Sequence, residues 1–507
     1  MRAHSRPDRS RAVTATGTAS LAALVAWGLL VRPRARHRHL PAHVTTSWRS
    51  KISSHDSFSH DSIDSLGYDW ERIANPSLPP KHPLKVYLPQ TTEEIIRVIK
   101  DAAQLGERVV VRSKGHSSND LVLADRGSIL VTEKLNSILE VREDEHTVKV
   151  QSGAVSAEID DHLADLGFGL PVIGDHAHIT VGGFASVGGI SPASHRFGMF
   201  VDNVLALEYV DWDGELHECG PDNEPERFHR VLAGLGREGV IATMTLRMIP
   251  IDKYGVIWKN ERGLFGNVDN FIEAAFKYIS DPVDVMMERG LWVDFPTRGG
   301  KSIGFGQFSA YKETEQSSYK RLRNQVEYGY LHGQGYFSGR LPPKIDRYLK
   351  FISFGGVLLS PIYASIKNIE MFTDKMLDSG VGDPTRMLIV LGPVERFETL
   401  FRTLFPLMID ARNEHDCFTF VSVYVKSIRS PYLANGSDQQ SFCELMFYFG
   451  INSEGMTDEI FDEIVSRFDD VCIEQEAFRY MHSKTVKDPE RLRLLDPNAR
   501  YAEVYTK

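Results

Sequence analysis

The chain has 507 residues, of which 42% are hydrophobic and 25% charged, and its formal net charge is −10. This length exceeds the size of a typical domain with a single hydrophobic core, so at least two folded units are expected. The composition is that of a globular protein. The excess of acidic residues disfavours nucleic acid as a partner, because binding to phosphates relies on clustered Lys and Arg. The four cysteines lie far apart without C-x-x-C spacing, which indicates neither a zinc site nor a disulfide framework.

Residues 1–45 are predicted to form an N-terminal tail that contains a candidate membrane anchor. Residues 12–31 carry no charge, and ~20 apolar residues suffice for a helix to cross a bilayer. Arginines flank this stretch on both sides, so the positive-inside rule gives no orientation. Membrane association is one interpretation. The alternatives are a disordered Ala/Thr-rich extension and a cleaved signal peptide, for which Arg32 to Arg38 makes a poor cleavage site.

The Ser/His/Asp-rich residues after the tail predict a linker over 46–79, and the first folded domain is predicted over 80–253. Thr91 and Glu94 form a capping-box pattern at the start of a helix that follows a short strand at 85–87. Further strands are predicted at 108–112, 128–132, 147–151, 204–211, 216–219 and 240–248, with helices at 157–166 and 226–233. This mixture of strands and helices predicts an α/β-rich domain.

The composition shifts towards aromatic residues beyond Tyr254, which predicts a second domain over 254–478. Its second half shows a helix at 394–409 and strand-like runs at 418–426 and 444–449. An antiparallel sheet with helices packed on one face fits this pattern, so the predicted fold class is α+β.

The segment Gly234–Gly239 reads G-x-G-x-x-G, which is the pattern of a Rossmann dinucleotide-binding turn. A Rossmann turn follows a strand and opens a helix. Here a helical pattern precedes the glycines and a strand follows them, so we reject that interpretation.

Two other glycine-containing segments, 113–119 and 180–189, are candidates for holding a phosphate group. A diphosphate needs several N–H donors with no side chain in between, and glycine turns or the start of a helix supply them. Either segment alone is also typical of an ordinary turn.

Taken together and in this order, five segments resemble the flavin-binding domain shared by vanillyl-alcohol oxidase, aldonolactone and alditol oxidases, cytokinin dehydrogenase and the sterol Δ24-reductase. The segments are V-Y-L-P-Q-T-T-E-E-I at 86–95, G-H-S-S-N-D at 115–120, V-K-V-Q-S-G-A at 148–154, I-T-V-G-G-F-A-S-V-G-G at 179–189 and L-A-G-L-G-R-E-G-V-I at 232–241. The resemblance implies a two-subdomain, PCMH-type FAD-binding domain over 80–253, followed by a cap domain over 254–478. It also implies an FAD-dependent oxidoreductase in which hydride passes to flavin N5 from a small or lipophilic alcohol, lactone or amine.

The resemblance further implies which residues hold FAD. They are Ser113, Lys114, Gly115, His116, Ser117, Ser118, Asn119, Thr180, Gly182, Gly183, Ser186, Gly188, Gly189, Gly239 and Ile241. His116 stands where covalent members of the family carry the histidine that is joined to the 8α carbon of the flavin, so FAD is expected to be covalent. A neutral imidazole is nucleophilic near pH 7, which suits this bond. The alternative is that His116 only hydrogen-bonds around non-covalent FAD.

Three residues are expected to take part in catalysis. Asp175 matches the position of the base of cytokinin dehydrogenases, which removes a proton while hydride leaves the neighbouring carbon; an exposed turn is the alternative. His482 and Lys484 resemble the H-x-x-K element of aldonolactone and alditol oxidases, although one residue is missing between them. This likeness implies that residues 479–507 return to the FAD domain and that Lys484 stabilises the negative charge of the reduced flavin. Simple surface charge is the alternative.

The substrate stays open at this point. The same oxidases bind substrate hydroxyls with an E-V-R strand, and its best counterpart here, Tyr424–Lys426, lacks the acid. The aromatic cap, Ser194–Gly198 and the ending Glu503–Tyr505 resemble the sterol-reductase branch. An NAD(P)H-dependent alkene reductase and a non-catalytic flavin-binding protein are therefore the alternative functions. A small-molecule partner is expected, and the sequence does not predict the oligomeric state.

Overall fold

The computed structural model describes residues 66–74, 78–282, 284–297, 302–337, 360–379, 385–434, 440–452, 454–485 and 488–500. The candidate membrane segment 12–31 lies outside these ranges. Among the helices within them, none combines the length and apolar character needed to cross a membrane. The last part of the predicted linker belongs to the described ranges and contains the short helix α4 (Trp70–Ala74).

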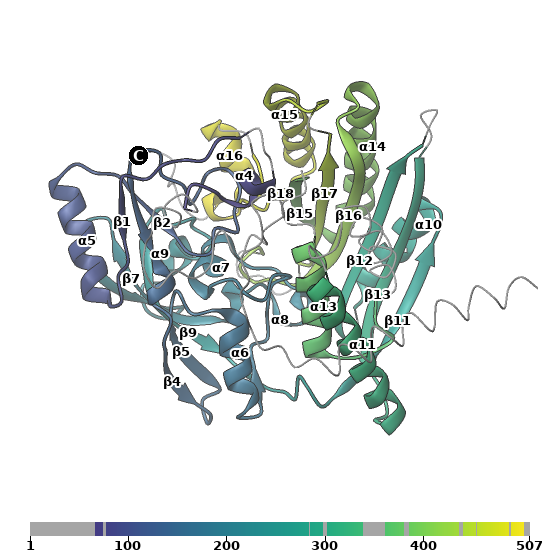
Figure 1. The fold of residues 1–507 in the computed structure, drawn as a ribbon, viewed down its shortest axis with the longest axis horizontal. Coiled ribbons are helices and arrows are strands. Elements are labelled where there is room, and N and C mark those ends of the chain that lie inside the picture. Colours follow the sequence, from purple (N-terminus) through teal and green to yellow (C-terminus); the bar gives the residue numbers. More distant parts are fainter. Residues whose placement is uncertain are drawn as a thin grey trace, which may run out of the picture.

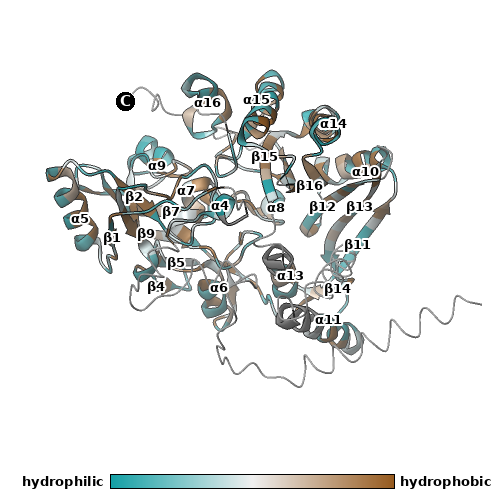
Figure 2. Ribbon diagram, turned by 45° about the horizontal axis from the view of Figure 1, so that its top comes forward, coloured by the Kyte–Doolittle hydropathy of each residue, from teal (hydrophilic) through white to brown (hydrophobic). Residues whose placement is uncertain are grey.

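The first domain begins with a three-stranded parallel sheet (Figure 1). Its strands, in the order β1–β3–β2, are β1 (Lys85–Tyr87), β3 (Ser128–Val131) and β2 (Val109–Arg112). Helix α5 (Thr92–Gln104) starts at the predicted capping box, where the Thr91 hydroxyl accepts a hydrogen bond from the Glu94 N–H at 3.3 Å. The helix buries Ile95 and Ile99 and turns its charged residues outwards (Figure 2).

A five-stranded antiparallel sheet forms the second part of this domain. Its order is β4–β5–β9–β7–β8, with β4 (Ile138–Arg142), β5 (Thr147–Gln151), β9 (Gly239–Arg247), β7 (Val204–Asp211) and β8 (Leu216–Cys219). The helices that accompany it are α6 (Ser156–Ala164), α7 (Val181–Val187), α8 (Ser194–Phe197) and α9 (Pro225–Val231). A two-stranded ladder joins β6 (Phe168–Gly169) to β10 (Ile249–Pro250) at its border.

The segment 180–189 is more regular than a pair of glycine turns. Residues 181–187 are helical, and Thr180 caps the helix by accepting a hydrogen bond from the Gly183 N–H. Only Gly188 and Gly189 turn, with φ of 106° and 78°. The helix is possible because Gly182 packs directly on Ser152, where an added Cβ would lie 2.7 Å from the Ser152 Cβ.

The second domain is built on an eight-stranded sheet whose ladders are antiparallel. Its order is β14 (Tyr363–Ser365), β11 (Ile257–Phe265), β13 (Ser302–Glu313), β12 (Val285–Pro296), β16 (Phe418–Ile428), β17 (Phe442–Ile451), β15 (Thr385–Pro393) and β18 (Phe478–Arg479). Helices α10 (Val268–Ser280), α14 (Phe397–His415) and α15 (Asp458–Glu474) share an apolar core with one face of this sheet. Helices α11 (Ser318–Phe337) and α13 (Ile366–Ser379) pack beside β14. The predicted α+β class is therefore confirmed.

The strands β15, β16 and β17 of the large sheet are buried on both faces over most of their length. Along β15, Leu388 and Val390 belong to the core under the helices, whereas Ile389 and Leu391 belong to a core shared with the first domain. Strands buried on both faces show continuous apolar runs instead of alternation, which is why these strands carry little polar periodicity. The consequence for function is that the second face of the sheet lies against the first domain.

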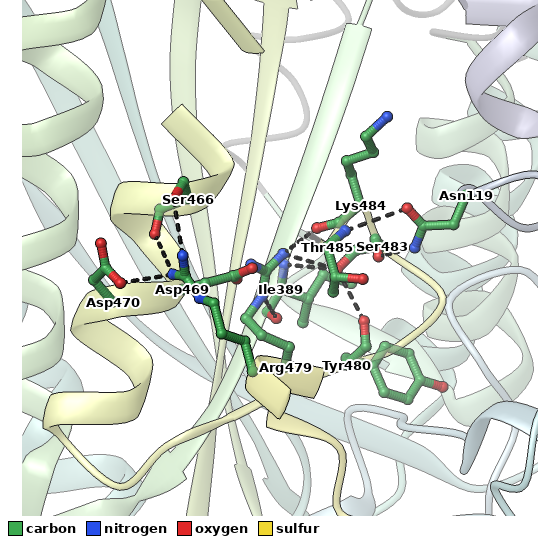
Figure 3. A network of polar contacts seen from close by, with 11 residues as sticks. Asn119, Ile389, Ser466, Asp469, Asp470, Arg479, Tyr480, Ser483, Lys484 and Thr485 are labelled. Carbon is green, nitrogen blue, oxygen red and sulfur yellow. Dashed lines mark hydrogen bonds and ion pairs between the residues drawn. The ribbon is translucent and has the colours of Figure 1, made fainter. Parts of the chain in front are cut away.

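The C-terminal segment is held between the two domains by a buried polar network (Figure 3). Arg479 is fully buried, forms an ion pair with Asp469 of α15, and donates to the backbone oxygens of Ile389 and Lys484 at 3.0 and 2.6 Å. On the other side, the Asn119 side chain donates to the Ser483 carbonyl at 2.5 Å. Residues 479–485 therefore connect the large sheet to the loop 113–119. Beyond them, helix α16 (Pro489–Leu495) follows.

Candidate functional site

A cavity lies where the first domain meets the large sheet. It is lined by the loop 113–117, by α7, by the start of β9 and by the facing strands β15, β16 and β17. Figure 1 shows α7 between the sheets of the first domain and the large sheet. Segments that are distant in the sequence thus converge on one space.

Most of the residues expected to hold FAD line this cavity. They are Ser113, Lys114, Gly115, His116, Ser117, Thr180, Gly182, Gly183, Ser186, Gly239 and Ile241. Four others do not line it: Ser118, Asn119, Gly188 and Gly189. The Ser118 N–H donates to the His482 carbonyl at 3.0 Å, and the Gly189 N–H donates to the Tyr480 hydroxyl at 3.0 Å. These four residues shape the walls of the cavity instead of facing it.

The loop 113–117 presents backbone donors that the rest of the described chain does not use. The N–H groups of Lys114, Gly115 and Ser117 have no acceptor within the described ranges. The Ser117 hydroxyl is also buried without a hydrogen-bond partner there. Gly115 has a φ of 74°, and an added Cβ would lie 2.4 Å from the Arg112 guanidinium. Open donors on a tightly supported glycine turn suit an anionic diphosphate, so this loop fits FAD.

Helix α7 and the loop before β9 complete the wall with small residues. Gly183 is exposed, and Ser186 and Val187, three and four residues further along, are half-buried on the same side of the helix. Leu235 and Gly236 line the cavity as well, both with positive φ. Helix α9 comes before these residues and strand β9 after them, which is the reverse of a Rossmann turn, as the sequence pattern predicted.

His116 belongs to a cluster of three rings at one side of the cavity. Its imidazole is stacked with the Trp70 indole at a centroid distance of 6.1 Å and an angle of 22°. The His176 ring meets His116 edge-on at 4.7 Å and Trp70 at 5.2 Å. All three residues line the cavity. The position of His116 is therefore set by an aromatic neighbour from α4.

A buried group of charges faces the cavity from the large sheet. The Lys426 Nζ lies 2.5 Å from Asp175 Oδ2 and 2.8 Å from Glu444 Oε2, and the Lys426 side chain is 2% exposed. Burial opposes the charge of Lys426, but the two carboxylates outweigh it and raise the pKa of the ammonium. Burial raises the pKa of Glu444, with Lys426 acting against this shift. The group is thus one cation between two carboxyl groups.

The same arrangement places an acid beside the Tyr424–Lys426 strand. An acid is missing from that strand in the sequence, but Glu444 of β17 supplies one, because it is the register partner of Lys426. The signal available in the sequence was a single Glu inside the otherwise apolar run Phe442–Phe449.

His482 and Lys484 differ in their placement. His482 lines the cavity, and burial, aided by the charges of His176 and Lys426, lowers its pKa to about 4. Its imidazole is therefore neutral near pH 7. The Lys484 side chain points away from Tyr480 (Figure 3), and its Nζ lies 3.7 Å from Asp462 of α15. Lys484 is therefore not among the lining residues of the cavity, and its position beside a bound flavin stays a prediction. Its backbone carbonyl accepts a hydrogen bond from Arg479 at 2.6 Å.

Several cavity residues were not predicted from the sequence. They are Trp70, Ser152, His176, Met387, Ile389, Met446, Tyr448 and Tyr480. Trp70 lies in the stretch predicted as a linker. The residues from the large sheet belong to strands whose neighbours are set by long-range pairing.

Residues 83–220 match a protein-family model described as an FAD binding domain. The chain therefore contains an FAD-binding domain. The match to this domain starts after α4 and ends before β9, so Trp70 and Ile241 line the same cavity from outside the matched range.

Curated relatives of the chain include several oxidoreductases. The chain is 32% identical over 169 residues to the uncharacterized oxidoreductase ORF5 in the fasciation locus of Rhodococcoides fascians. This aligned region covers 33% of this chain and 37% of that protein. It is 29% identical over 174 residues to D-arabinono-1,4-lactone oxidase of Eremothecium gossypii, covering 33% of this chain and 32% of that protein. It is 31% identical over 202 residues to cytokinin dehydrogenase 2 of Arabidopsis thaliana, covering 39% and 40%. The similarity thus spans well under half of each relative.

Proposed function

We propose that the chain is an FAD-dependent oxidoreductase that removes hydride from a carbon bearing a hydroxyl or amino group. The observation that carries this proposal is that the His116 loop and the Asp175–Lys426–Glu444 group line one cavity. FAD, when bound, supplies the hydride acceptor at N5. The chain supplies the groups that bind the substrate and take its proton. Both of the named relatives with a stated activity, a lactone oxidase and a cytokinin dehydrogenase, are oxidoreductases.

Asp175 is the candidate base. Its Oδ2 is held by Lys426, whereas its Oδ1 is buried and has no hydrogen-bond partner among the described residues. A buried acceptor without a donor is costly, so a substrate O–H or N–H that donates to Oδ1 satisfies it. As hydride leaves the carbon, that same proton passes to Asp175. Lys426 and Glu444 hold the carboxylate in position.

The lysines that line the cavity are paired with carboxylates, which favours an uncharged or cationic substrate over a substrate that carries a carboxylate. Lys426 is paired with two carboxyl groups, and the Lys114 Nζ lies 3.7 Å from Glu133. Among the described lining residues both lysines are thus already paired, so a substrate carboxylate would meet Asp175 and Glu444 without a further lysine to offset them. The same wall carries Met387, Ile389 and Met446 beside these charges. We therefore propose an alcohol or amine with an apolar body as the substrate class.

We also propose that His116 attaches FAD covalently. His116 would hold FAD through a bond from an imidazole nitrogen to the 8α carbon. Forming that bond would release one proton from the methyl group and one from the imidazole. The two electrons would be taken up by the flavin ring and then by dioxygen or another two-electron acceptor. The contacts of the His116 ring with Trp70 and His176 support this role, because neighbouring rings limit the movement of the imidazole.

Anaerobic titration of the purified flavoprotein tests the proposed reaction. A panel of alcohols and amines with apolar bodies should include a compound that bleaches the oxidised flavin absorbance with one equivalent per flavin. Carboxylate-bearing analogues of that compound should react at least about tenfold more slowly. Bleaching by NADPH but by no member of the panel would instead identify a reductase. No bleaching by either would leave only flavin binding.

Acid precipitation tests the covalent link. Yellow colour should stay with the precipitated wild-type protein and should move to the supernatant for His116→Ala. The matched control is His178→Ala, because His178 is exposed and close in sequence to Asp175. Wild-type flavin that dissolves completely in the acid supernatant would refute the link while leaving the proposed reaction intact.

A further inference from the structure

The short segment 66–74 precedes the range matched by the FAD-binding domain, which starts at residue 83. It nevertheless reaches the cavity, because Trp70 is one of the lining residues. Its polar residues are buried too: Asp69 is 0% exposed, and Glu71 and Arg72 are 7% exposed. This degree of burial is unusual for charged side chains unless they are paired.

The backbone of this segment is tied to both sides of His116. The Trp70 N–H lies 3.1 Å from the Gly115 carbonyl and 3.0 Å from the Ser117 carbonyl. The Arg112 guanidinium packs against Gly115 of the loop and donates a hydrogen bond to the Tyr68 carbonyl at 2.8 Å. The loop that carries His116 is thus gripped at the residue before and at the residue after the histidine.

Two side chains of the segment, Arg72 and Glu71, make further contacts with the loop and with the large sheet. Arg72 forms a two-pronged ion pair with Asp120 at 2.9 and 2.8 Å, at the far end of the loop. Glu71 accepts a hydrogen bond from the Asn119 N–H at 3.3 Å and forms an ion pair with Arg386 of β15. A bidentate pair fixes the geometry of both side chains, and the Arg72 side chain is buried although Asp120 is 36% exposed. The segment therefore connects the His116 loop to β15 of the large sheet.

We propose that residues 66–74 form a clasp that belongs to the FAD site, with Trp70 as the residue that positions His116. The indole ring stacks on the imidazole and closes this side of the cavity, so the histidine is held facing the flavin. This inference rests on the proposed function only in taking FAD as the ligand. It assigns to the flavin site a segment that lies outside the matched domain.

The test compares Trp70→Leu and Trp70→Phe in the full chain. Both replacements keep an apolar side chain, but only Phe keeps a ring that can stack on His116. For Trp70→Leu, the acid-stable flavin per chain should fall at least about tenfold, whereas Trp70→Phe should stay within about twofold of the wild type. If the wild-type flavin is not covalent, the dissociation constant of FAD from titrated apoprotein should rise by the same factor. Tyr319→Leu is the matched control, because Tyr319 is 62% exposed on α11.

Circular dichroism and cooperative thermal unfolding show whether each variant is folded. A folded Trp70→Leu protein with wild-type flavin content, attachment and affinity would overturn the clasp and leave the proposed function standing. Equal losses in the Leu and Phe variants would overturn the role of ring stacking. If Trp70→Leu does not fold, Trp70→Phe and Arg72→Met are compared instead. Flavin that is retained by Trp70→Phe and lost in Arg72→Met supports the clasp. Full retention of flavin in both variants contradicts it. Wild-type protein that binds no FAD would refute the proposed function itself.

Discussion

Lys426 and Glu444 face each other as register partners on β16 and β17, with 2.8 Å between the Lys426 Nζ and the Glu444 Oε2. The acid that is missing from the Tyr424–Lys426 strand thus comes from the neighbouring strand. Both residues line the cavity, so an acid and a cation meet there. This part of the site therefore depends on strand pairing.

Replacing Lys426 with Met should destabilise the fold strongly. The substitution leaves Glu444 buried beside Asp175 without a cation, and removing one partner of a buried ion pair costs about 3–5 kcal/mol. Denaturant unfolding measures this loss. The double variant Lys426→Met/Glu444→Gln should recover much of it, because one buried carboxyl charge is removed as well. Equal instability of the single and the double variant would contradict the pairing.

Replacing Asp175 with Asn should slow substrate oxidation while leaving the flavin bound. Loss of a general base lowers turnover by about 10²–10⁴-fold. The measurement is the rate of anaerobic flavin bleaching by an alcohol or amine substrate, with the flavin spectrum as a check on the site. Asp165→Asn, at the exposed end of α6, is the control and should react at the wild-type rate. A wild-type rate in Asp175→Asn would remove this residue from catalysis.

Lys484→Ala should change flavin content and turnover by less than about twofold, because exposed ion pairs contribute little. The Lys484 Nζ lies near Asp462, whose side chain is 64% exposed. Lys484 is not among the residues that line the cavity. Flavin absorbance per chain and steady-state rates give the answer. A tenfold loss in either quantity would return Lys484 to the flavin site.

Glu288 should make stability depend on pH. Burial raises its pKa from the ordinary value of 4.5 to about 7, and hydrogen bonds from Ser427 act against this shift. The folded state therefore holds a proton that the unfolded state releases, so the contribution of Glu288 to stability falls as the pH rises from 4.5 towards 7. Glu288→Gln mimics the protonated form at every pH. The free energy of unfolding of the variant minus that of the wild type should therefore be larger at pH 8 than at pH 4, by up to about 3 kcal/mol.

Denaturant unfolding at both pH values checks the Glu288 prediction. Glu273→Gln is the control, because Glu273 is exposed on α10 and should show no such pH-dependent difference. The same stability difference between Glu288→Gln and the wild type at both pH values would show that Glu288 does not titrate in this range.

Local signals in the sequence determined much of the first domain. The capping box at Thr91 and Glu94, the strand at 204–211 and its hairpin partner at 216–219 all form as predicted, because caps, turns and strand patterns act within a few residues. The glycine-containing turn at 113–119 was identified in the same way, whereas the role expected of His116 came from the resemblance to the flavin-binding domain. A glycine turn keeps its conformational signature wherever the rest of the chain lies.

Tertiary structure alone decided what surrounds that loop. Lys426 and Glu444 meet through strand register, Trp70 comes from a stretch that resembles a linker, and the Lys484 side chain lies near Asp462 of α15. None of these outcomes has a local signature. The strands β15, β16 and β17 are buried on both faces, so they show no alternation that reveals which side chains face the cavity. Contacts between residues far apart in the chain are set by the packing of the whole molecule, and that packing fixed the charges and the aromatic ring around the flavin site.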